Sequence, residues 1–337
     1  MVNLLEIMNS SQSMLSFLMA DTATQSNLNM RQFWGIPVAL VGAVLLSFGA
    51  QYQSRGLNKV EQLTGKSASA GLSGRHILSL FKRPSWVLGT SFLGLATAFQ
   101  LVSLSLSPLI VVQPIGVVAL IVTAILNSKY SGVTLGFKAK NAIAMSVIGI
   151  TAFVVIAAFT ARDRTVTDAK LTTILILFGI VLVLTVSAYL LLRSKAIALM
   201  YIIGSGVLYG FVATFAKTVI GRFQQDQFDT LTWISVVALL TGAVLGMVFV
   251  QNAYSSGPPD LVVAGLTVID PLVAVMIGIA VLHEANDASI FEIVGFIVTG
   301  IIAMIGVINL AKYHPQTGMT ALIATNTGSI PVFKKKQ

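Results

Sequence analysis

The sequence predicts an all-α polytopic membrane protein with about nine transmembrane helices arranged as inverted structural repeats. Charged residues make up only 10% of the chain and mean hydropathy is +0.88, whereas soluble proteins are about a quarter charged. The chain contains nine apolar runs of about 20 residues, the length that crosses a bilayer core as a helix. These runs are continuous and do not alternate with period two, so strands are not expected. The repeats are predicted by a proline-containing stretch that occurs twice.

The predicted elements follow one another along the chain as two transmembrane halves between polar ends. Residues 1–32 form a loose or amphipathic leader, because their apolar stretch is interrupted by Glu6 and by polar residues. The first half covers 33–160 and includes a basic cytoplasmic loop at 54–84. The second half covers 161–313, and a disordered basic tail follows at 314–337. The predicted crossings are 33–53, 86–105, 108–128, 140–160, 171–192, 197–219, 231–253, 260–282 and 289–311.

The distribution of basic residues predicts the orientation in the cell membrane. Nine crossings place the two termini on opposite sides. With the N-terminus outside, the inner segments hold 15 Lys and Arg residues and the outer segments hold 6. Because cytoplasmic loops retain Lys and Arg, this bias predicts an outside N-terminus and a cytoplasmic C-terminus. It also accounts for the net charge of +9 without a nucleic-acid partner.

Several classes of chemistry lack their sequence signatures. The chain has no cysteine, so it has no disulfide framework and no thiolate metal site. No phosphate-binding GxxxxGK[ST] motif occurs, and His283-Glu284 does not continue into HExxH. The three histidines, at 76, 283 and 314, have no metal-ligand spacing. We therefore expect neither an enzyme, nor a cofactor, nor a metal site.

A proline-containing pattern recurs at an offset of 157 residues. "VVQPIGVVALIVTAIL" at 111–126 matches "VIDPLVAVMIGIAVL" at 268–282, with Gln113-Pro114 aligned on Asp270-Pro271. The same offset aligns "IGI" at 148–150 with "IGV" at 305–307. By the predicted topology the two copies run in opposite directions. Inverted repeats that handle a substrate where they meet are typical of secondary transporters.

This arrangement resembles the drug/metabolite transporter superfamily over residues 33–311. The segments that carry the resemblance are "LSLSPLIVVQPIGVVALIVTAILNSKYSG" and "AYSSGPPDLVVAGLTVIDPLVAVMIGIAVLHE", the latter ending in Leu282 and Glu284 as is typical there. Nine helices and the turn at 114–116 are similar to the NIPA-like and EamA-like branch, which implies magnesium transport for NIPA members. That branch commonly has threonine before each proline, where this chain has Gln113 and Asp270.

Asp270 is the leading candidate for a binding residue. It lies near the middle of its run, where a carboxylate costs on the order of 3 kcal/mol. Pro271 lacks an N–H and frees the carbonyl of Thr267, which is one turn away on the same face. Carboxylate, hydroxyl and carbonyl are thus expected to converge on a proton or cation site. The alternative is a structural aspartate bonded to a neighbouring helix.

Three further polar residues join the candidate site, and other polar positions are interpreted structurally. Gln113 and Gln100 are either binding groups or interhelical hydrogen-bonding residues, and Tyr209 follows "GSGVL". Pro114 and Pro271 are the predicted helix-breaking positions. We expect Gly206 and Gly210 to pack closely on another helix, and Lys217 to extend to the membrane surface. His283, Glu284, Asp287 and Glu292 are expected to be solvated loop residues or a cation-attracting cluster.

Four functions remain open at this point. The first is a secondary transporter that moves a small solute or ion by alternating access, with Asp270 as the proton or cation site. The second is a divalent-cation transporter, although a single buried carboxylate supplies few oxygen ligands for such an ion. The third is a flippase whose basic loop binds phosphate headgroups, and the fourth is a non-transporting membrane scaffold. The expected partners are the substrate, the lipid bilayer and, left open, a second copy of the chain.

Overall fold

A computed structural model of the protein describes residues 32–53, 84–131, 136–192, 198–256 and 259–313. The predicted leader, the basic loop 54–84 and the tail 314–337 lie almost entirely outside these residues. The described part is helical and contains no strand. It has eight helical spans that are long and apolar enough to cross a membrane. The chain is therefore an all-helical membrane protein, as the sequence predicts.

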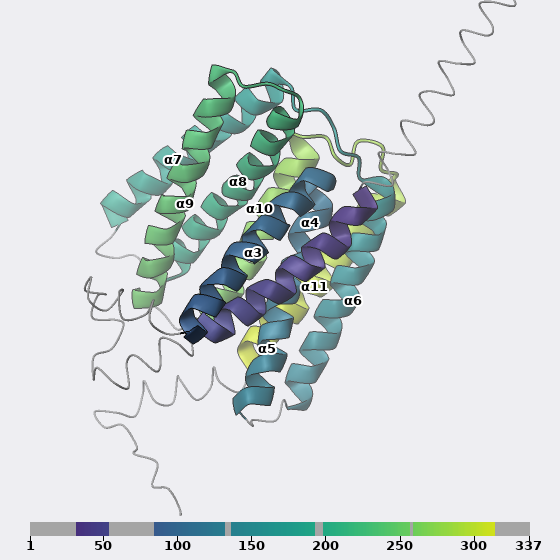
Figure 1. Ribbon diagram of the computed structural model, residues 1–337, viewed down its shortest axis with the longest axis vertical. Helices are drawn as coiled ribbons and strands as arrows, with labels where there is room; N and C mark the ends of the chain where they lie inside the picture. The colour runs from purple at the N-terminus through teal and green to yellow at the C-terminus, as the bar shows by residue number, and fades with distance from the viewer. Residues whose placement is uncertain (1–31, 54–83, 132–135, 193–197, 257–258, 314–337) are drawn as a thin grey trace, which may run out of the picture.

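The helices follow the predicted runs closely, with bounds that differ by a few residues (Figure 1). Their bounds are Gln32–Gln53, α3 Pro84–Leu106, α4 Leu109–Ile115, α5 Val117–Ser131, α6 Phe137–Thr160, α7 Asp168–Leu192, α8 Ala198–Gln224, α9 Thr230–Ser256, α10 Pro259–Ala280 and α11 Ile290–Tyr313. Helix α10 is not among the eight spans. Its apolar part, Gly265–Ala280, is shorter than the length needed to cross a membrane.

The predicted run 108–128 contains one membrane-length span, Leu109–Leu126, whose helix is interrupted at Gly116. It divides there into α4 and α5, and the Gly116 N–H is bonded to the Gln113 carbonyl 3.2 Å away. Pro114 removes one backbone donor, and Gly116 itself keeps right-handed helical dihedral angles (φ −54°, ψ −30°), so the interruption is local. Pro271 has no such glycine after it, and α10 continues through it to Ala280. Only one of the two predicted helix-breaking prolines therefore ends a helix.

The helices form one bundle in which α3, α4 and α10 lie between two flanking groups (Figure 1). On one side α8 packs on α9 and α10, with α7 at the periphery; on the other, α6 packs along α11. Gly206 and Gly210 of α8 allow the close approach to α10. A Cβ at either glycine would lie 2.7 Å from Ile269 or Val273 of α10, which confirms their predicted packing role.

The α6–α11 contact is reciprocal. A Cβ on Gly149 would lie 2.7 Å from the Cα of Ala303, and a Cβ on Gly306 would lie 2.9 Å from the Cα of Ser146. Gly149 and Gly306 are separated by 157 residues, and so are Ser146 and Ala303. The contact of Gly149 on α6 with Ala303 on α11 thus recurs with the two helices exchanged, between Gly306 on α11 and Ser146 on α6.

Four described loops, 107–108, 161–167, 225–229 and 281–289, gather at one end of the bundle, which we call the 161–167 end. Hydrogen bonds join two of these loops, 161–167 and 281–289, directly. The Arg162 N–H donates to the Glu284 carbonyl over 2.8 Å, and the Arg164 guanidinium pairs with Asp287 over 2.7 Å. By the predicted orientation this end faces outward.

Candidate functional site

The five polar residues predicted as a site line a single cavity. Gln100 of α3, Gln113 of α4, Tyr209 of α8, and Thr267 and Asp270 of α10 contribute to its wall. The volume is about 530 Å³, which is in the range of small-molecule sites. The structure thus brings together residues up to 170 positions apart in the sequence.

Asp270 places a carboxyl group with an unused oxygen at this cavity. The residue as a whole is half-buried, but its Oδ1 atom is covered and has no hydrogen-bond partner among the described residues. Gly210 allows α8 so close that a Cβ there would lie 3.0 Å from the Asp270 carbonyl. The contact also holds Tyr209 beside the cavity. Buried polar groups are normally paired, so an unpaired carboxyl oxygen requires an explanation.

Thr267 lines the cavity but does not bond to Asp270. Its hydroxyl donates to the Val263 carbonyl one turn earlier, 2.7 Å away. Only its oxygen lone pairs remain for a ligand, so the expected convergence with Asp270 is partial. Thr267, Pro271 and Pro114 also line a second, apolar cavity of about 100 Å³ on another side of α10.

The described lining of the cavity carries one acidic side chain and no basic one. That acidic side chain belongs to Asp270. Most of the wall is apolar, which strengthens any charge interaction inside it. Across the described ranges, no group of three or more His, Cys, Asp or Glu side chains that could hold a metal ion is found.

Lys217 lies near the cavity, and its predicted extension to the membrane surface is wrong. Only 4% of the residue is exposed. Its Nζ donates to the carbonyls of Leu104 and Ser107 over 2.8 and 2.9 Å, and to Asp163 Oδ2 over 2.8 Å. The ammonium is retained inside because the end of α3 presents carbonyls that have no partner within the helix.

Glu284 is also buried, contrary to its predicted place in a solvated loop. It is 1% exposed, and its two carboxyl oxygens accept the Leu109 and Ile110 N–H groups over 2.9 Å each. It thereby caps the first turn of α4, the helix that carries Gln113. Burial raises the pKa of Glu284 to about 7, although Lys217 and the two N–H groups act in the opposite direction.

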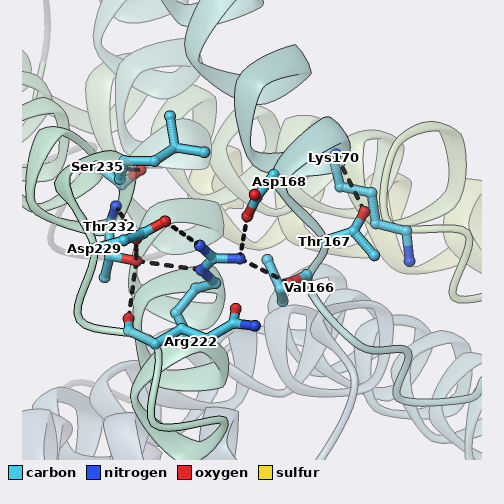
Figure 2. Close-up of polar contacts among 10 residues, drawn as sticks. Val166, Thr167, Asp168, Lys170, Arg222, Asp229, Thr232 and Ser235 are labelled. Carbon is cyan, nitrogen blue, oxygen red and sulfur yellow. Dashed lines mark hydrogen bonds and ion pairs between the residues drawn. The ribbon is translucent and has the colours of Figure 1, made fainter.

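A third buried charge, Arg222, joins three helices at the 161–167 end (Figure 2). It is 2% exposed and pairs with Asp168 at the start of α7 and with Asp229 before α9, both over 2.6 Å. It also donates to the Thr232 hydroxyl and the Val166 carbonyl. Asp229 accepts from the hydroxyl and N–H of Thr232, which lowers the pKa of Asp229 to about 2.

Lys217, Glu284 and Arg222 were not predicted to make internal polar contacts. For two of them a signal exists. Thr214, Lys217, Thr218 and Arg222 recur at spacings of three and four residues along α8, the pattern of one helix face. All four are buried.

Comparison with known proteins adds one relative. An uncharacterized protein of Corynebacterium glutamicum is 24% identical over 282 residues, which cover 81% of this chain and 93% of that protein. No protein-family model matches the chain, and no solved structure matches it. The similarity therefore extends over nearly the whole length of the relative and assigns no substrate.

Proposed function

We propose that this chain is a secondary transporter of the drug/metabolite type, which moves a small solute or ion across the cell membrane by alternating access. Asp270 is the residue that binds the coupling proton or the cationic group of the substrate. The observation that carries the proposal is the buried Asp270 Oδ1 atom, which has no partner among the described residues and belongs to a side chain that lines a cavity with four other polar residues.

This observation bears on the structural alternative for Asp270. A structural aspartate in a membrane bundle is retained because neighbouring helices satisfy its oxygens. Here the nearest hydroxyl on the same helix, that of Thr267, donates elsewhere. A carboxyl group that costs on the order of 3 kcal/mol at mid-membrane is better explained by a ligand or proton that it binds. The same cost disfavours a scaffold.

The reciprocal contact of α6 with α11 supports inverted repeats. A two-fold relation between halves requires that equivalent residues exchange roles across their interface. Gly149 with Ala303 and Gly306 with Ser146 meet this requirement at the offset of 157 residues. Gln113 and Asp270, at the same offset, line one cavity. On this proposal α10, 22 residues long, is the ninth crossing.

The cavity favours a proton or an organic cation over a divalent metal ion. Magnesium demands near-ideal octahedral oxygen coordination and is usually held by one or two carboxylates and several waters. The cavity offers one carboxylate within a mostly apolar wall, and its volume of about 530 Å³ suits a small molecule. The basic segment invoked for a flippase lies outside the described residues, so the structure adds no support for that alternative.

A substrate screen with a matched pair of variants tests the proposal. Purified protein is reconstituted in liposomes and assayed for flux of organic amines, divalent cations and anionic metabolites. Asp270→Asn keeps the shape of the side chain and removes its charge, and Asp287→Asn makes the same change at an exposed residue. We expect cation flux that Asp270→Asn abolishes and Asp287→Asn preserves. Equal cation flux in both variants contradicts the proposed site.

A further inference from the structure

Buried polar contacts join the cavity-lining helices to one another toward the 161–167 end. Leu104 near the end of α3 lines the cavity, and Ser107 directly follows this helix. On α8, Ala216 lines the cavity and Lys217 follows it directly. The Lys217 ammonium joins α8 to the end of α3 by donating to the Leu104 and Ser107 carbonyls, and it also donates to Asp163 in the 161–167 loop.

A second set of contacts joins α4 and α10 at the same level. Glu284 accepts the first two N–H groups of α4, while its own N–H donates to the Gly278 carbonyl near the end of α10 over 3.0 Å. A Cβ on Gly278 would lie 2.9 Å from a Glu284 carboxyl oxygen, so the absence of a side chain there admits the carboxylate. Glu284 thus holds the ends of two cavity-lining helices together.

The helix Gln32–Gln53, which also lines the cavity, is joined to the same junction. The Ser103 hydroxyl donates to the Gly35 carbonyl over 2.8 Å, and the Ser107 hydroxyl donates to the Gln32 carbonyl. Both serines are fully buried. Of the six described helices that line the cavity, all except α5 therefore have a polar tie at this end.

We propose that Lys217 and Glu284 form the gate that closes the cavity at the 161–167 end, the outer end under the proposed orientation. Opening requires the Lys217 ammonium to leave the two carbonyls at the end of α3, and Asp163 retains it during this step. Asp163 suits that role because its side chain is 30% exposed and so reaches solvent. This inference rests on the proposed transport function, but the closure itself is measurable without a substrate.

The gate is placed to respond to the binding site. Lys217 follows Tyr209 on α8 by eight residues, and Gly278 follows Asp270 on α10 by eight residues. Each interval corresponds to about 12 Å along a helix. A tilt of α8 that follows binding at Asp270 therefore moves Lys217, and a tilt of α10 moves Gly278, the contact of Glu284.

Cysteine accessibility tests the gate, since the chain contains no native cysteine. Ala216→Cys reports the cavity just below Lys217, and Leu266→Cys reports the cavity toward the opposite end. Each is combined with Lys217→Met, which keeps the length of the side chain and removes its charge. The rate of labelling by a water-soluble maleimide is measured for protein in lipid nanodiscs.

We expect Lys217→Met to raise the labelling rate at Ala216→Cys about tenfold or more, equivalent to about 1.4 kcal/mol or more, and to lower the rate at Leu266→Cys. Alternating access predicts opposite changes at the two positions, whereas general loosening of the bundle raises both. Lys170→Met, the same change at a partly exposed lysine of this end, should leave both rates unaltered. An unchanged rate at Ala216→Cys, or a rise at both positions, overturns the gate.

Glu284→Gln provides a second variant if Lys217→Met does not fold. Glutamine has one acceptor oxygen, so one of the two α4 N–H groups loses its partner, and labelling at Ala216→Cys should rise by a smaller factor. No rise in this variant also overturns the gate. The proposed function fails separately: if Asp270→Asn retains full flux while the labelling changes occur, the gate stands and the role of Asp270 does not.

Discussion

Adding a methyl group at the α6–α11 contact should destabilise the bundle equally from either helix. Gly149→Ala places a Cβ 2.7 Å from the Cα of Ala303, and Gly306→Ala places one 2.9 Å from the Cα of Ser146. Carbon atoms pack at about 3.5 Å or more. The backbone nitrogens of Ala303 and Ser146 lie closer still, at 2.4 and 2.5 Å. The helices must therefore separate by at least about 0.8 Å in the first variant and about 0.6 Å in the second.

The expected energies follow from this separation. Overpacking of a close contact costs about 1–3 kcal/mol, while alanine in place of a helical glycine returns up to about 1 kcal/mol. We expect a net loss of about 1–2 kcal/mol of unfolding free energy for each variant. The double variant should lose less than the sum, because one separation of the helices accommodates both methyl groups.

Unfolding of purified protein in mixed micelles measures these energies, and Gly300→Ala is the control. It makes the same change on α11, where a Cβ meets the nearest Phe153 ring atom at an ordinary 3.7 Å. This control should be neutral or slightly stabilising. If Gly149→Ala and Gly306→Ala are as stable as Gly300→Ala, the reciprocal close contact does not exist.

Three further predictions concern charge, orientation and the cavity. The pKa of Asp229 is lowered to about 2, so its ionised form stabilises the fold above about pH 4 and this contribution is lost as pH falls from 4 to 2. Asp229→Asn should flatten that part of the profile of melting temperature against pH. A profile identical to that of the unsubstituted protein would contradict this prediction. Reporter fusions after residues 70 and 320 should be cytoplasmic and one after residue 165 external; a cytoplasmic reporter at 165 reverses the proposed orientation. Gln113→Ala should reduce flux less than Asp270→Asn does, because no charge is lost; an equal or larger loss would make the amide essential.

Helix positions could be predicted from the sequence because hydrocarbon length dictates them. A run such as 171–192 leaves few alternatives, and α7 covers Asp168–Leu192. The division at Gly116 was less predictable, since the Pro114 and Pro271 stretches look alike and only the first has a glycine two residues later. A proline alone does not end a membrane helix, because neighbouring helices can satisfy the freed backbone groups.

The cavity residues could be predicted from the sequence, whereas the gate residues could not. A charge such as Asp270 in mid-run is costly wherever it points, so it attracts notice without any knowledge of partners. Lys217 and Glu284 lie near the ends of runs, where solvation explains a charge equally well. Their partners are backbone groups of Leu104, Ser107, Leu109 and Ile110, 110 to 175 residues away, and no side-chain pattern records a backbone contact.

The pH dependence of flux in Asp270→Asn tests the central claim most directly. Proteoliposomes are loaded with the best cation from the screen, and flux is measured over a range of imposed pH gradients. If Asp270 carries the coupling proton, the asparagine variant should insert and fold normally, retain the cavity and lose pH-dependent flux, because it has no titratable group in mid-membrane. Full flux with an unchanged dependence on the pH gradient would contradict the account.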